Sequence, residues 1–127
     1  MTPAQRARSR ASSFRHAFSG WWYVLRSQRN AWIHALATLV VVAAGLWLGV
    51  DRLSWALLLG AIGLVWLAEF LNTALEAVVD LASPELHPLA KVGKDVGAAA
   101  VLIAALTAAA IGLLVLGPQL YSRFLGG

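Results

Sequence analysis

The distribution of apolar residues divides the 127-residue chain into three long hydrophobic segments with short polar stretches between them. A helix needs about 20 apolar residues to cross a hydrocarbon core of about 30 Å. We therefore expect membrane spans at residues 32–50, 53–80 and 96–116. The second segment is longer than one crossing, so its polar end should extend into water. Residues 81–95 follow this end and are expected to form a loop and a short helix. Residues 119–127 are expected to form a short tail after the third span.

The N-terminal part of the chain has a different pattern. Residues 1–13 are polar and basic without periodicity, which favours a disordered tail. Residues 14–29 carry apolar and aromatic residues at helical spacing, with arginines mostly elsewhere on the helix, as is typical of a helix lying at a membrane surface. The apolar positions are Phe14, Phe18, Trp21, Trp22 and Leu25. The predicted fold is an all-α integral membrane protein with three transmembrane helices and an N-terminal amphipathic surface helix.

Composition agrees with this pattern. Hydrophobic residues make up 60% of the chain and charged residues only 13%, too little polar surface for a water-soluble domain of this size. The length allows one domain and leaves no room for a separate nucleotide-binding module. The chain has no cysteine, which excludes disulfides, a thiol nucleophile and thiolate metal sites.

The basic residues are distributed unevenly along the chain. Arg52 and Arg123 lie on one side of the predicted membrane, and the other eight of the ten lysines and arginines lie on the opposite side. Cytoplasmic segments are enriched in such residues, so the N-terminus is predicted inside and the C-terminus outside. This distribution explains the net charge of +4 without a nucleic-acid partner, which we do not expect. Three short helices cannot enclose a polar cleft well, so an oligomer is expected.

Polar residues follow a regular spacing at the end of the second segment. Glu69, Asn72, Glu76 and Asp80 are separated by steps of three, four and four residues. At 3.6 residues per turn, three carboxylates and one amide lie along one side of a helix. Carboxylates in or beside a bilayer are costly and indicate a functional site. Oxygen ligands of this kind suit Mg²⁺ shared with substrate phosphates, and a free carboxylate could accept a proton from a hydroxyl substrate.

Two further polar clusters are predicted on the same side of the membrane, and a lysine among them could stabilise a phosphoryl group during transfer. Structural explanations remain open for several residues: Asp80 as a solvated or salt-bridged carboxylate, Asp95 as a helix-dipole partner, and His34 as a packed residue. For Glu85, outside these clusters, a role in the first turn of a helix is favoured. A structural role is hardest to justify for Glu69, which follows a long apolar stretch. The sequence has neither a phosphate-binding Gly-rich loop nor a protein-kinase catalytic loop. The clusters are Gln28, Asn30 and His34, and Lys91, Lys94 and Asp95.

The stretch from Glu69 to Asp80, EFLNTALEAVVD, resembles the signature of the prokaryotic diacylglycerol kinase family. The resemblance continues through His87–Lys91 and Lys94–Asp95 and covers residues 14–118 in total. It implies a homotrimer in the bacterial cytoplasmic membrane, with active sites between neighbouring subunits. It also implies transfer of the γ-phosphoryl group of MgATP to the hydroxyl of a membrane lipid.

The resemblance also implies roles for individual residues. Glu69 would be the general base, Glu76 a metal ligand, and Asn72 a support for metal and phosphate. Lys94 would neutralise phosphate charge. The remaining assignments are nucleotide contacts for Asp95 and Asp80, and a second metal-ligand position at Gln28, where many family members carry glutamate.

The sequence leaves the acceptor lipid and two alternative functions open. The loop SPELHPLAK, residues 83–91, looks like the branch that phosphorylates undecaprenol, but diacylglycerol is also a long apolar molecule ending in a hydroxyl. The alternatives to a lipid kinase are a non-catalytic small membrane subunit and a degenerate kinase that kept only nucleotide binding.

Overall fold

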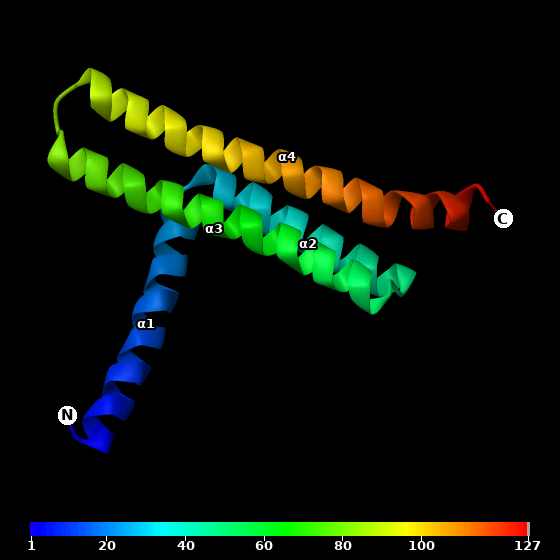
Figure 1. The fold of residues 1–127 in the computed structure, drawn as a ribbon, viewed down its shortest axis with the longest axis horizontal. Helices are drawn as coiled ribbons and strands as arrows, with labels where there is room; N and C mark the ends of the chain where they lie inside the picture. Colours follow the sequence, from blue (N-terminus) through cyan, green and yellow to red (C-terminus); the bar gives the residue numbers. More distant parts are fainter. Residues whose placement is uncertain (127) are drawn as a thin grey trace.

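The structure, a computed structural model, describes residues 1–126, which form helices joined by short connections. These helices are α1 (Pro3–Ser27), α2 (Arg29–Leu48), α3 (Arg52–Ala82) and α4 (Pro88–Phe124). The helices α2, α3 and α4 are each long and apolar enough to cross a membrane. The prediction of an all-helical chain with three membrane-length helices is therefore confirmed. Figure 1 shows α3 and α4 as a long antiparallel pair, and α1 projecting steeply away from it.

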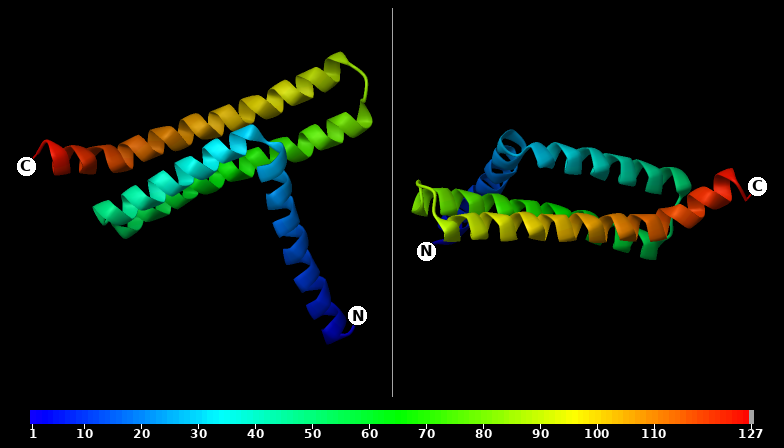
Figure 2. Two further views of the ribbon diagram at one scale, coloured as in Figure 1. Left: turned by 180° about the vertical axis from the view of Figure 1, so that it is seen from behind. Right: turned by 90° about the horizontal axis from the view of Figure 1, so that it is seen from above.

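The α3–α4 pair is the packed centre of the chain. Its buried positions on α3 recur every three or four residues, as expected for one face of a helix: Leu58, Ala61, Val65, Glu69 and Asn72. The facing positions on α4 are small or medium-sized, Gly97, Val101 and Ala104, and small residues let helix backbones approach closely. The helix α2 lies on one face of this pair (Figure 2). Most large apolar side chains of α2, α3 and α4 point outward, which suits a lipid environment.

A tight turn joins α2 to α3. Gly49 ends α2 in the left-handed region, with φ of 64°, where a side chain would be strained. Asp51 then caps α3 by accepting a hydrogen bond from the Ser54 backbone N–H at 2.9 Å. Hydrogen bonds from Ser54 hold the pKa of the Asp51 carboxyl below its ordinary value.

The N-terminal segment differs from the expectation. Residues 3–13 are helical rather than disordered, because α1 begins at Pro3. Thr2 and Gln5 form a capping box: the Thr2 hydroxyl accepts from the Gln5 backbone N–H at 3.1 Å, and the Gln5 side chain accepts from the Thr2 N–H at 2.7 Å. Proline at the first helical position supports the same start.

The C-terminal helix also differs from the expected boundaries. The connection after α3 is limited to residues 83–87, and α4 runs without a break from Pro88 to Phe124. The expected short helix and the third span are thus one helix, which continues past Pro118 into the predicted tail. A proline removes one backbone hydrogen bond, and membrane helices often tolerate this loss.

Candidate functional site

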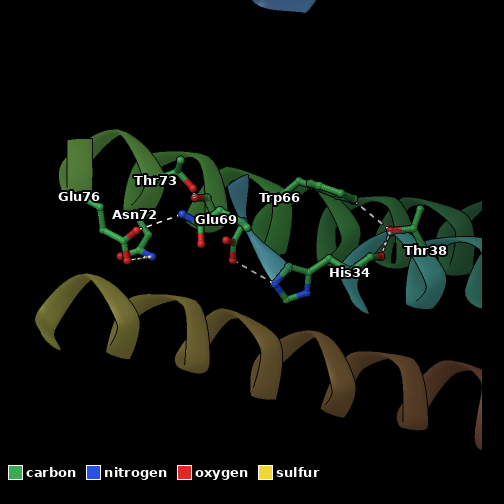
Figure 3. Close-up of polar contacts among 8 residues, drawn as sticks. His34, Thr38, Trp66, Glu69, Asn72, Thr73 and Glu76 are labelled. Atoms are coloured by element: carbon green, nitrogen blue, oxygen red, sulfur yellow. Dashed lines mark hydrogen bonds and ion pairs between the residues drawn. The ribbon is translucent and has the colours of Figure 1, made fainter. Parts of the chain in front are cut away.

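Glu69 lies on the side of α3 that faces α2 and α4, with its side chain 1% exposed. Its Oε2 atom is 3.2 Å from Nε2 of His34, which comes from α2 and is 11% exposed. Figure 3 shows the two side chains pointing toward one another. The other carboxylate oxygen, Oε1, is buried and has no hydrogen-bond partner within residues 1–126. A buried polar atom without a partner is costly, so Oε1 is suited to accept a hydrogen bond from a ligand.

Two turns further along α3 from Glu69, Glu76 receives hydrogen bonds from two amides. Gln28, at the junction of α1 and α2, donates from Nε2 to Glu76 Oε2 at 3.0 Å, and Asn72 donates from Nδ2 to Oε1 at 3.4 Å. The structure therefore brings together Gln28, Asn72 and Glu76, which the sequence places in two separate segments. The residues of α3 in this cluster point toward α4 (Figure 3).

Asn72 has an unused acceptor where α3 packs against α4. Its Oδ1 atom is buried and finds no partner in the described part of the chain. It lies directly opposite Gly97 of α4, where a β-carbon would collide with it. Glycine at this position thus leaves room for the Asn72 amide between α3 and α4.

The charged residues in the first turns of α4 form two ion pairs. Lys94 pairs with Asp80 of α3, so the structure brings this lysine to the end of the carboxylate stripe. Lys94 precedes the apolar part of α4, and its hydrogen bond to Asp80 raises its pKa above the ordinary value. Asp95 pairs instead with Lys91, and both side chains are exposed. Asp95 therefore does not join the Glu69–Glu76 cluster within one chain.

Three polar residues near Glu69 were not singled out from the sequence. Thr73 donates to the Glu69 backbone carbonyl at 2.8 Å, Thr38 donates to the His34 carbonyl at 2.7 Å, and Trp66 donates from Nε1 to the Thr38 hydroxyl at 3.0 Å. Their spacing was available as a signal: Trp66 and Thr73 are three and four residues from Glu69, and Thr38 is four residues from His34.

The donor set suits a hard cation that is shared with phosphates. Among the described residues no three His, Cys, Asp or Glu side chains gather as a metal cluster. Mg²⁺ nevertheless usually takes only one or two carboxylates from the protein, together with substrate phosphates and water. The Glu76 carboxylate and the unpaired Asn72 oxygen are ligands of this kind. Gln28 presents its N–H₂ group to Glu76, so its amide would have to turn to offer oxygen.

An apolar groove runs along the outside of the α3–α4 pair to this cluster. Leucines and small residues line it, and Asn72 is its one polar lining residue among those described. Its lining includes Leu67, Leu71, Leu75, Val96, Gly97 and Ala100.

The fold and the site define a small helical membrane protein with a buried carboxylate–amide cluster at one end of its spans. A family model described as prokaryotic diacylglycerol kinase matches residues 15–116, and the chain belongs to that family.

Relatives support this assignment along most of the chain. The chain is 40% identical to the undecaprenol kinase of Bacillus subtilis (strain 168) over 108 residues, which cover 85% of this chain and 88% of the relative. It is 42% identical to the diacylglycerol kinase of Synechocystis over 111 residues, covering 87% of this chain but 63% of the relative, less than two thirds of its length. It is 41% identical to the Escherichia coli (strain K12) diacylglycerol kinase over 93 residues, covering 68% of this chain and 76% of the relative. The resemblance identified from Glu69–Asp80 is confirmed, and the chain is an ATP-dependent lipid kinase.

Proposed function

We propose that this lipid kinase uses Glu69 as the general base on the hydroxyl of its lipid acceptor. The observation that carries the proposal is the unpaired, buried Oε1 atom of Glu69. A hydroxyl is a hydrogen-bond donor, so binding it at Oε1 would satisfy this atom and place the proton on its path to the base. A carboxylate used only for structure would have both oxygens paired or solvated.

The groove along α3 and α4 supports a lipid acceptor. Its lining is apolar apart from Asn72, so it suits a hydrocarbon chain whose polar end lies at the Asn72 side. The acceptor would then reach the site from within the membrane, and ATP from the water at the polar end of the helices.

The reaction requires one bond to form and one to break at the γ-phosphorus. The lipid oxygen forms a bond to phosphorus, the bond from phosphorus to the β,γ-bridging oxygen breaks, and ADP leaves. The hydroxyl proton passes to Glu69. Catalysis of this transfer depends mainly on positioning and on stabilisation of the phosphate charge. We propose that Lys94 supplies positive charge there, and its ion pair with Asp80, at the end of the carboxylate stripe, supports this role.

Glu76 and Asn72 would hold Mg²⁺ at this site, with Gln28 beside them. When bound, the ion would neutralise charge on the β- and γ-phosphates of ATP. The nucleotide contact proposed for Asp95 requires a ligand that reaches the exposed side of α4, where this residue pairs with Lys91.

We also propose that the protein lies in the cytoplasmic membrane with its N-terminus on the cytoplasmic side, and that three copies of the chain form a homotrimer. The uneven distribution of basic residues supports the orientation. Only Ala31 and Gly45 of α2 are buried, so most of this helix is free to contact lipid or a neighbouring chain.

Of the two acceptors in the names of the relatives, we propose undecaprenol. Residues 83–91 resemble that branch, and the match to the B. subtilis undecaprenol kinase covers 88% of that relative. The match covers 63% of the Synechocystis diacylglycerol kinase and 76% of the E. coli diacylglycerol kinase.

The role of Glu69 is tested by Glu69→Gln, with Glu85→Gln as the matched control. Glu85 lies in the exposed connection between α3 and α4, so its substitution removes the same charge away from the site. General-base catalysis typically contributes 10²–10⁴-fold, and we expect a loss of about that size in lipid phosphorylation for Glu69→Gln only. Full activity of a folded Glu69→Gln protein would overturn the assignment.

A further inference from the structure

We propose that His34 is the positioning residue of the general base: its Nε2–H donates to Glu69 Oε2 and thereby directs Oε1 toward the acceptor hydroxyl. This inference rests on the proposed role of Glu69. His34 lies on α2, whereas Glu69 lies on α3. In this proposal Oε2 of Glu69 is held by His34, and Oε1 accepts the proton of the acceptor hydroxyl.

The two oxygens of the Glu69 carboxylate have different surroundings. Oε2 lies 3.2 Å from His34 Nε2, whereas Oε1 has no partner in residues 1–126. A carboxylate can only accept hydrogen bonds, so the imidazole nitrogen that faces it must carry a proton. His34 thus fixes one oxygen and leaves the other available to a ligand.

His34 is itself restrained by its neighbours on α2 and α3. The Thr38 hydroxyl donates to the His34 carbonyl at 2.7 Å and accepts from Trp66 Nε1 at 3.0 Å, which ties α2 to α3 beside the imidazole. The Trp66 ring lies edge-on to the His34 ring, with centroids 6.1 Å apart. Figure 3 shows this chain of contacts running from Thr38 and Trp66 to His34 and Glu69. A side chain held in this way is preorganised to orient its partner.

The His34 and Glu69 side chains are both largely shielded from solvent. His34 is 11% exposed and Glu69 is 1% exposed, so water cannot readily replace the imidazole as the donor to Oε2. Loss of this hydrogen bond would leave the carboxylate free to rotate, and the proton acceptor would no longer lie at a fixed place. The expected effect is on the chemical step rather than on ATP binding.

The decisive experiment compares His34→Gln with His34→Asn. Both variants put a neutral amide at position 34, but only the longer glutamine can place its N–H₂ group where Nε2 lies in histidine. We expect His34→Gln to keep kcat within about threefold of the parent. We expect His34→Asn to lose about 10- to 100-fold in kcat, the usual range for one hydrogen bond to a charged group, with an unchanged KM for ATP.

His16→Asn is the matched control, because it makes the same substitution at an exposed position of α1, away from the Glu69 carboxylate, and we expect it to leave kcat unchanged. Thermal unfolding in detergent micelles checks that all variants are folded. Equal kcat for the Gln and Asn variants, or a rise in KM for ATP without a fall in kcat, would overturn the inference. If Glu69→Gln is inactive while His34→Asn is fully active, only the role of His34 fails. If Glu69→Gln is active, the role of Glu69 as the base fails as well.

Discussion

Gly97 lies where α4 passes Asn72, and its replacement by alanine tests whether the close approach of the two helices is needed for activity. A β-carbon at Gly97 would collide with Asn72 Oδ1 and would lie 3.2 Å from Leu75 Cδ2. One turn earlier, a β-carbon at Gly93 would lie 3.7 Å from Val79 Cγ2, an ordinary van der Waals distance. Gly93→Ala is therefore a matched control on the same helix.

The two substitutions share one energetic contribution and differ in another. Alanine in place of glycine in a helix interior contributes about 0.5–1 kcal/mol of stability at both positions. Overpacking at Gly97 opposes this gain, with a typical cost of about 1–3 kcal/mol. The difference in unfolding free energy between the two variants isolates the packing cost, so we expect Gly97→Ala to be less stable by about 1–3 kcal/mol.

The assay combines unfolding and activity. Helicity is followed while SDS is titrated into detergent micelles that contain each variant, and lipid phosphorylation is measured on the same samples. We expect Gly97→Ala to lose activity even where it is folded, because the Asn72 amide must move, and Gly93→Ala to stay active. Equal stability and equal activity of the two variants would refute the packing argument.

Two charge changes give further predictions. Gln28→Glu places a second carboxylate beside Glu76, and we expect a lower Mg²⁺ concentration for half-maximal activity; Gln5→Glu, at the start of α1, is the control. An unchanged or higher Mg²⁺ requirement would mean that position 28 is not a ligand. Lys94→Met should raise the KM for ATP several-fold, whereas Arg8→Met, at an exposed position of α1, should not, because only Lys94 is held at the end of the carboxylate stripe. Equal KM values for the two variants would contradict this role of Lys94.

The spans and the polar stripe could be predicted because both depend on spacing along one helix. Glu69 and Asn72 are buried on the same face of α3, as their three-residue step predicts, and Glu76 follows one turn later. The pairing between helices could not be predicted in the same way. That His34 contacts Glu69, and that Lys94 contacts Asp80 while Asp95 turns to Lys91, depends on how the helices pack together.

The helix boundaries were less predictable for local reasons. The start of α1 depends on the reciprocal hydrogen bonds of Thr2 and Gln5, a signal that the basic composition of residues 1–13 obscured. A proline such as Pro118 usually indicates a helix end in water, but α4 continues past it to Phe124, and membrane helices tolerate the backbone hydrogen bond that a proline removes.

The most direct test of the central claim is phosphate transfer from γ-radiolabelled ATP by the purified protein, in mixed micelles that contain either undecaprenol or diacylglycerol. We expect label to enter undecaprenol preferentially and Glu69→Gln to abolish this transfer. Preferential labelling of diacylglycerol would contradict the proposed acceptor. Label in neither lipid would contradict the assignment of this chain as an active lipid kinase.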